Sequence, residues 1–303
     1  MISMDLRAEY NDTRERETYC HGSETIRAGA MKRVAAIVGM MRPWNCAALG
    51  LLYLGMIRTS GDEAQWFGVG LAGSLAWALA AAAGYCWNDI YDVEVDRIGH
   101  PDRALPAGRL SIRGAVGVGG GLTVGAIALA AGVGWDLAAM VVSALVASWL
   151  YSGWLRKRSA LGANLLCAAM VAAVPLSTWK VGPGTAAAVG SYALALTMVR
   201  EALKDVLERD ADSLVRPRPT LFRLSNEAVR WCCWGAIGLL LVLGSWVAFA
   251  TENAWGVFLS GVSVALGVWA IVLVRPGASV GARSSQLLKA AAYMLTIAIW
   301  SAR

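Results

Sequence analysis

The sequence contains little histidine, phenylalanine or charge. Two histidines occur in 303 residues, so catalysis or metal binding by histidine is not expected. The six cysteines include no CxxC pair, and we expect them to be small buried apolar side chains. Charged residues make up 16% of the chain and hydrophobic residues 57%, with fourteen Trp against four Phe. This composition predicts an all-α integral membrane protein that forms one continuous helical domain.

A polar lead precedes nine apolar segments. The lead, residues 1–32, has no apolar core of the signal-peptide kind, and we expect it to be a flexible cytosolic segment. The rest, residues 33–303, is predicted to be a single transmembrane domain. Its apolar segments predict nine transmembrane helices, at about 35–57, 66–88, 112–134, 136–154, 161–179, 185–203, 227–250, 254–274 and 285–301.

The basic residues support this count. With the N-terminus in the cytoplasm, Lys and Arg concentrate in the lead and in the cytoplasmic loops. The opposite side then holds only Arg58, Lys180 and Arg303. The net charge of +6 is therefore read as a topology signal and not as a nucleic-acid surface.

One acidic cluster follows the second apolar segment. On a helix, Asn88, Asp89, Asp92 and Asp96 fall within about 100° of arc, and Glu94 points to the opposite side. No permanent counter-charge of comparable size is evident, so the carboxylates would repel one another unless a cation lies on that face. Hard oxygen ligands without His or Cys favour Mg²⁺. The alternative interpretation is a solvated acidic helix end.

A second cluster follows the sixth segment with the same spacing. Asp205, Glu208 and Asp212 repeat it, and Glu201 lies one turn earlier. In the predicted topology both clusters lie on the cytoplasmic side, within the polar loops 89–111 and 200–226, which we expect to form a cap over one cavity. Two acidic faces across a cavity can hold Mg²⁺ and a diphosphate, and apolar helix faces suit a long hydrocarbon. An isoprenoid diphosphate combines both features.

Several short motifs resemble the UbiA superfamily of intramembrane prenyltransferases. Asn88–Asp96 matches its first aspartate-rich motif and Arg200–Asp212 its second, while the stretch 101–109, Arg42-Pro43-x-Asn45 and Tyr151-Ser152-x-x-Leu155-Arg156 also fit. The resemblance covers about residues 35–301 and implies nine transmembrane helices around a central cavity with a cytosolic cap. Glu208, Ala211 and Ala104 depart from the usual Asp, Gly and Pro, which weakens assignment to one subfamily.

The resemblance and the positions together give a set of expected site residues. Asp92, Asp205 and Lys204 are expected to be catalytic. The expected Mg²⁺ ligands are Asn88, Asp89, Asp92, Asp96, Asp205, Glu208 and Asp212. The expected contacts with the prenyl diphosphate are Asn45, Arg103, Arg156, Lys157 and Lys204. For the basic residues the alternative is topology charge, and for Asn45 it is a link between helices. Nearby Tyr and Trp side chains fit either cation stabilisation or an interfacial belt.

The expected activity is Mg²⁺-dependent transfer of a prenyl group to a small or lipid acceptor in the membrane. A phenol, a glycerol phosphate lipid or a tetrapyrrole fits the acceptor, and the second motif looks most like the lipid- and polyketide-directed branches. A terpene cyclase on the same fold is the alternative. Small residues at 78–84 are expected to leave volume for a second substrate or a folded chain. A transporter or scaffold is disfavoured because the acidic residues lie at predicted helix ends.

Overall fold

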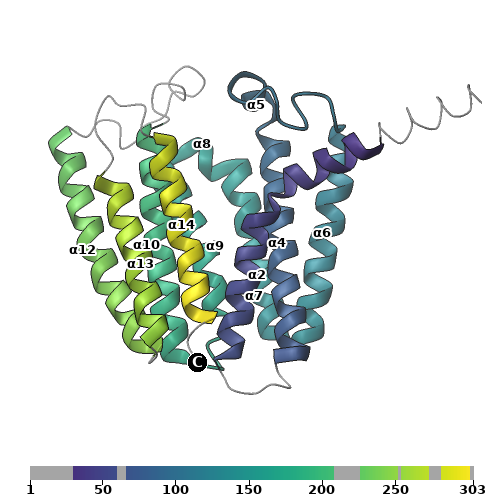
Figure 1. Ribbon diagram of the computed structural model, residues 1–303. Helices are drawn as coiled ribbons and strands as arrows, with labels where there is room; N and C mark the ends of the chain where they lie inside the picture. Colours follow the sequence, from purple (N-terminus) through teal and green to yellow (C-terminus); the bar gives the residue numbers. More distant parts are fainter. Residues whose placement is uncertain (1–29, 60–65, 208–225, 252–253, 273–280, 301–303) are drawn as a thin grey trace, which may run out of the picture.

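The computed structural model describes residues 30–59, 66–207, 226–251, 254–272 and 281–300, and within them it is a bundle of helices (Figure 1). A helix at Ala30–Met41 precedes the others. Two π-helical segments, η1 (Trp66–Gly70) and η2 (Tyr151–Leu155), adjoin α4 and α7. The α-helices that follow are α2 (Pro43–Arg58), α4 (Leu71–Tyr91), α5 (Val93–Gly99), α6 (Ile112–Val133), α7 (Trp135–Leu150), α8 (Arg156–Arg158), α9 (Ala160–Leu176), α10 (Pro183–Leu207), α12 (Asn226–Thr251), α13 (Ala254–Val272) and α14 (Gly281–Trp300).

Each predicted apolar segment coincides with a helix or with two helices in succession. The segment predicted at 112–134 is α6, and that predicted at 185–203 is part of the longer α10. By length and composition, three helical stretches among the described residues are long and apolar enough to cross a membrane, namely Trp66–Tyr91, Ile112–Val133 and Trp135–Arg158. A fourth is added if the bent pair Ala30–Met41 and Pro43–Arg58 is one span. The chain is thus a multi-pass membrane protein with several apolar helices.

The helices form a closed ring. Each of α2, α4, α6, α7, α9, α10, α12 and α13 packs against the next one in this order, and α14 returns to pack against α2. The Tyr293 hydroxyl of α14 donates to Asn45 Oδ1 of α2 at 3.0 Å and so joins the two ends of the ring. As Figure 1 shows, α4 and α10 end at the same end of the bundle, which brings the two motif-bearing ends to one side.

A sharp bend separates the first helix from α2. The axes of Ala30–Met41 and Pro43–Arg58 differ by 49°. Arg42, between them, has φ 51° and ψ 62°, a left-handed conformation that is uncommon for a residue other than glycine. Pro43 contributes to the bend because a proline disfavours the α conformation in the residue before it. The bend turns the Ala30–Met41 helix across the end of the bundle (Figure 1).

Small residues of α4 are used for packing. Ala80, Ala82 and Ala83 are buried, and a Cβ added to Gly84 would lie 2.9 Å from Ser148 Oγ of α7. Small side chains allow such close approach of helices in a membrane. The expectation that the stretch 78–84 leaves volume for a substrate is therefore wrong for these positions, since the facing helix fills the space.

A small apolar cluster fastens the loop after α5 to the bundle. Leu105 of the loop packs with Met40, Cys86, Val93 and Ala115, all of which are buried. Gly108, at φ 68°, lies within the turn that the loop makes next and allows it to form. Backbone N–H groups of Arg109 and Leu110 then donate to the carbonyl oxygen of Ala104 at 3.0 and 3.3 Å. The arginines on either side of this turn are consequently held in place.

Candidate active site

The first acidic motif extends across the junction of α4 and α5. The N–H of Asp92 donates to Asn88 O at 2.9 Å, and the N–H of Asp96 donates to Asp92 O at 2.8 Å, so helical bonding continues through the junction. Asp89, Asp92 and Asp96 are 7%, 3% and 4% exposed, whereas Glu94 is exposed and pairs with Arg97. The predicted common face of three aspartates is confirmed, and it faces the protein and not the solvent.

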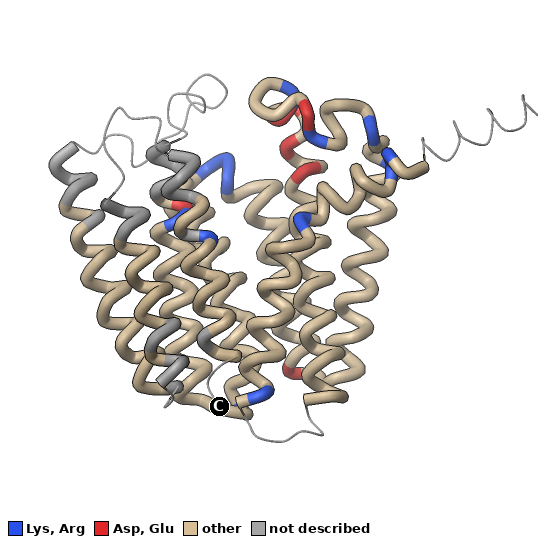
Figure 2. The backbone as a smooth tube through the Cα atoms, viewed as in Figure 1, with Lys and Arg blue, Asp and Glu red and all other residues tan. Residues whose placement is uncertain are grey.

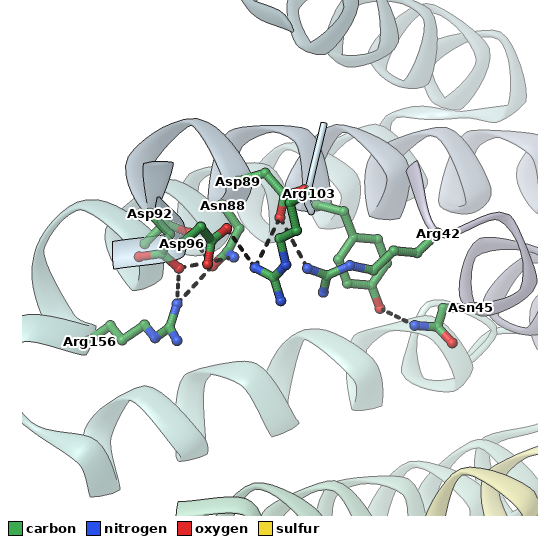
Figure 3. A network of polar contacts seen from close by, with 10 residues as sticks. Arg42, Asn45, Asn88, Asp89, Asp92, Asp96, Arg103 and Arg156 are labelled. Carbon is green, nitrogen blue, oxygen red and sulfur yellow. Dashed lines mark hydrogen bonds and ion pairs between the residues drawn. The ribbon is translucent and has the colours of Figure 1, made fainter. Parts of the chain in front are cut away.

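Each of these aspartates is paired with an arginine (Figure 3). Arg42 Nη2 lies 3.1 Å from Asp89 Oδ1. Arg103 Nη1 lies 2.6 Å from Asp96 Oδ2 and 3.9 Å from Asp89 Oδ1. Arg156 forms an ion pair with Asp92. The expectation that the cluster lacks a counter-charge of comparable size is therefore wrong, because three arginines surround the three carboxylates, two of them, Arg42 and Arg156, from distant parts of the chain.

Arg156 is positioned by the π-helical segment η2. Ser152 of this segment is 1% exposed, and its hydroxyl donates to Asn88 Oδ1 at 3.3 Å. The Asn88 amide nitrogen in turn donates to Asp92 Oδ2 at 3.2 Å. A π-helical turn shifts the register of the residues after it, and such turns are frequent at functional sites. Arg156 thus reaches a carboxylate 64 residues earlier in the chain.

The second acidic motif lies only partly within the described residues. Glu201 of α10 is 7% exposed and forms an ion pair with Arg200. Lys204 and Asp205 belong to α10, but their side chains are not among those described. Glu208 and Asp212 lie outside the described residues. In Figure 2 most of the charged residues lie at the end of the bundle that carries the first motif.

The other expected contacts take different places. Lys157, on α8, is exposed. Asn45 bridges helices: its amide nitrogen donates to the Tyr85 hydroxyl at 3.2 Å, and its oxygen accepts from Tyr293. This is the linking role weighed for Asn45, and a contact with substrate stays a prediction. Among the aromatic candidates, Trp87 donates to Thr123 Oγ1 at 3.3 Å and so packs toward α6.

Arg42 is a functional candidate that was not among the expected diphosphate contacts. Its guanidinium contacts Asp89 and also lies 4.6 Å from the centre of the Tyr85 ring. Its left-handed backbone directs it there, and strained backbone of this kind persists where the surrounding structure enforces it. The proline at position 43 was a signal for the bend, although it does not reveal the partner.

The donor atoms of the first motif fit magnesium by type. Three carboxylates and the Asn88 amide provide hard oxygen ligands, and the three carboxylates are buried. Within the described part of the chain, no three His, Cys, Asp or Glu side chains converge as a metal site. Each carboxylate of the first motif instead turns toward an arginine, and the remaining expected ligands belong to residues 205–212.

Comparison with known proteins gives the class of membrane protein to which this fold and site belong. The model of the UbiA prenyltransferase family matches residues 37–295. The chain belongs to this family.

Two curated relatives of the chain share one name. A digeranylgeranylglyceryl phosphate synthase of Halobacterium salinarum is 33% identical over 259 residues, which is 82% of this chain and 85% of that protein. A protein of the same name from Methanoculleus marisnigri is 31% identical over 243 residues, covering 76% and 82%. This chain is therefore homologous to archaeal synthases of that name.

Solved structures share the fold. A solved structure from work on digeranylgeranylglyceryl phosphate synthase in membranes superposes on this chain with a TM-score of 0.65 at 19% identity. The superposition covers 89% of this chain and 98% of that one. A UbiA homologue from Archaeoglobus fulgidus, bound to GPP and Mg²⁺, gives 0.58 at 16% identity, covering 88% and 99%. The all-helical bundle described above is thus the fold of UbiA membrane proteins.

Proposed function

We propose that this protein transfers a prenyl group, in the presence of Mg²⁺, from an isoprenoid diphosphate to a lipid acceptor with a glyceryl phosphate head group. The observation that carries the proposal is the set of three buried aspartates, each beside an arginine, at one end of a bundle of this family. Carboxylates provide metal ligands, and arginines provide fork-shaped donors to phosphate oxygens. The names of the archaeal relatives support a geranylgeranyl donor and a glyceryl phosphate acceptor.

The proposed metal ligands come from both motifs, namely Asn88, Asp89, Asp92, Asp96, Asp205, Glu208 and Asp212. Bound Mg²⁺ supplies positive charge that neutralises the leaving diphosphate. The A. fulgidus homologue bound to GPP and Mg²⁺ supports this assignment. Glu208 reaches about one methylene further than an aspartate, which displaces its oxygens relative to the usual ligand.

The chain's own cations are proposed to hold the diphosphate. Arg103 and Arg156 already lie beside the first motif. Lys157 follows Arg156 on α8, and Lys204 lies in the last turn of α10. The bond between the allylic carbon and the diphosphate oxygen breaks, and its electron pair leaves with the diphosphate. The acceptor hydroxyl oxygen then donates a pair to that carbon, and its proton passes to the departing diphosphate. Asp92, Asp205 and Lys204 are the residues we expect to be indispensable.

The proposed arrangement in the membrane follows from the ring of helices. We infer nine transmembrane helices around a central cavity, with residues 33–303 as one domain and residues 1–32 as a cytosolic lead. The N-terminus and a cap formed by 89–111 and 200–226 face the cytoplasm in this proposal. The supporting observation is that basic residues gather at the end of the bundle with the first motif (Figure 2).

The test is a reconstituted assay. Purified protein in lipid nanodiscs receives geranylgeranyl diphosphate, geranylgeranylglyceryl phosphate and Mg²⁺, and products are identified by mass spectrometry. A product with two geranylgeranyl groups on glyceryl phosphate is expected. A second arm omits the acceptor: little beyond slow hydrolysis to linear alcohol is expected, while a dominant cyclic hydrocarbon would replace the transferase by a terpene cyclase.

A further inference from the structure

A cavity of about 260 Å³ lies beside the first acidic motif, under the helix Ala30–Met41. The loop after α5 forms its other side. Its lining includes Gly39, Arg42, Asp89, Asp102, Arg103 and Arg109. In Figure 3 Arg42 and Arg156 lie at opposite ends of the row of carboxylates. The cavity is thus on the far side of Asp89 from the pair formed by Asp92 and Arg156.

The cavity has an excess of positive charge. Three arginines line it against two carboxylates, Asp89 and Asp102. Arg42 and Arg103 both contact Asp89, and Arg103 also contacts Asp96. Arg109 donates to the backbone oxygen of Asp102 and makes no ion pair within the described residues. Its guanidinium carries five N–H donors in a rigid fork, so it retains the capacity to bind a phosphate oxygen.

The size of the cavity selects what can enter. Sites that hold whole drug-sized ligands measure roughly 300–1,000 Å³, so this cavity takes a head group and not a twenty-carbon chain. One wall is apolar, made by Ala35, Ala36 and Met40. On the same helix Val34 and Val38 are 60% and 46% exposed, which provides apolar surface for a hydrocarbon chain at the membrane boundary. The combined features suit an amphiphile with an anionic head.

We propose that this cavity binds the phosphate group of the acceptor lipid, with Arg109 as its principal donor and Arg42 beside it. This inference rests on the proposed function and adds the origin of acceptor selectivity. The donor diphosphate is assigned to the side of Asp92 and Asp96, where Arg156 and Arg103 bind these carboxylates, and the acceptor phosphate is assigned to the side of Arg109. The two anionic groups are thereby bound on either side of Asp89, and the reacting carbon and hydroxyl lie between them.

The first experiment compares Arg109→Gln with the wild type on two acceptors. One is geranylgeranylglyceryl phosphate and the other is the same lipid without its phosphate. For the wild type, loss of the phosphate raises the acceptor KM at least tenfold. Arg109→Gln raises the KM for the phosphorylated lipid by a similar factor and leaves the donor KM unchanged. The two losses are not additive, because they remove the two partners of one contact.

The matched control is Arg97→Gln. Arg97 lies on α5, before the loop that carries Arg109, pairs with exposed Glu94 and does not line the cavity. Its replacement removes the same charge from the same end of the protein. The acceptor KM of this variant stays at the wild-type value. An equal rise in both variants would overturn the proposal, because general surface charge would then account for acceptor affinity.

A second variant fills the cavity without removing charge. Gly39 lines the cavity, and a Cβ added to it would meet no atom within 4 Å, so Gly39→Leu is compatible with the helix. It raises the acceptor KM and preserves the donor KM. Gly117→Leu is its control, since Gly117 is also helical, has equal space and lies outside the cavity. An unchanged acceptor KM in Gly39→Leu would contradict the assignment.

Direct binding separates this inference from the proposed function. Radiolabelled geranylgeranylglyceryl phosphate is bound to the protein in nanodiscs without donor, with inorganic phosphate as competitor. Binding that Arg109→Gln weakens at least tenfold, without turnover in any assay, would retain the site and refute the transfer reaction. If the protein turned over and the acceptor KM of Arg109→Gln equalled that of the wild type, the proposed acceptor site would be refuted while the transfer reaction would stand. If inorganic phosphate displaced the radiolabelled lipid at millimolar concentration and bound as tightly as the lipid does, the cavity would be a free-phosphate site and the lipid assignment would be overturned.

Discussion

The pairing of Asp92 with Arg156 gives Asp92→Asn two separate effects. Asp92 contributes a proposed metal ligand, so the variant loses transition-state stabilisation and its rate falls on the order of 10³-fold or more, which corresponds to about 4 kcal/mol. The side chain is also the partner of Arg156, whose side chain is 21% accessible while that of Asp92 is 4% accessible. Removing it leaves a largely buried guanidinium with a weaker partner.

The stability loss can be estimated from this burial. Removing one partner of a buried ion pair costs about 3–5 kcal/mol of stability. Here the cost falls to about 2–3 kcal/mol, because asparagine keeps an oxygen that can accept from Arg156 and because Arg156 is partly exposed. For a chain of 303 residues we expect a fall in Tm of about 3–5 °C. Without the arginine, the same variant would have relieved repulsion between carboxylates and raised stability.

The double variant Asp92→Asn/Arg156→Gln distinguishes the two effects. Because no unpaired charge remains, its Tm returns most of the way toward the wild type, while its rate stays low. The control is Asp136→Asn, whose partner is Lys180 in a pair that is 75% and 78% accessible, and which should change neither quantity. Rates come from the reconstituted transfer assay and Tm from a thermal unfolding assay in detergent. A near-normal rate in Asp92→Asn would refute the site, and an unchanged Tm would refute the ion pair.

Three further predictions follow from the site. EDTA abolishes turnover and added Mg²⁺ restores it, since the proposed hard oxygen ligands need the metal; undiminished activity in EDTA would exclude the metal assignment. Asp205→Asn lowers the rate on the order of 10³-fold, as measured by diphosphate release, and a wild-type rate would reduce the second motif to a solvated helix end. Arg42→Gly lowers Tm less than Arg42→Ala, because glycine accepts φ 51° without strain; the reverse order in thermal unfolding would contradict the left-handed backbone.

The helices were predictable because their signal is local. A run of apolar residues reports its own length, and the predicted segment 112–134 differs from α6 by one residue. The common face of Asp89, Asp92 and Asp96 was also predictable, because it depends only on helical periodicity. Local signals say nothing of partners, and Arg42 and Arg156 reach their aspartates from 47 and 64 residues away.

The same limit explains the error over small residues in α4. Alanine and glycine predict a close approach or an open space equally well, and the choice depends on whether another helix faces them. Ser148 of α7 faces Gly84, so the space is filled. Open space occurs instead at Gly39, on the other side of Asp89, where the Ala30–Met41 helix leaves the axis of α2. The direction of the Ala30–Met41 helix depends on the bend at Arg42, and Pro43 was the one sequence feature that indicated this bend.

The bend at Arg42 links the acidic motif to the cavity. Because Arg42 adopts a left-handed conformation, one residue both directs its guanidinium to Asp89 and turns the preceding helix over the loop that carries Arg103 and Arg109. A straight helix through position 42 would carry residues 30–41 away from that loop and leave no wall opposite Arg109. The charge that neutralises Asp89 and the wall that encloses the proposed acceptor site therefore depend on the same backbone conformation. This dependence explains why a residue with a strained backbone is found between Asp89 and the proposed acceptor site.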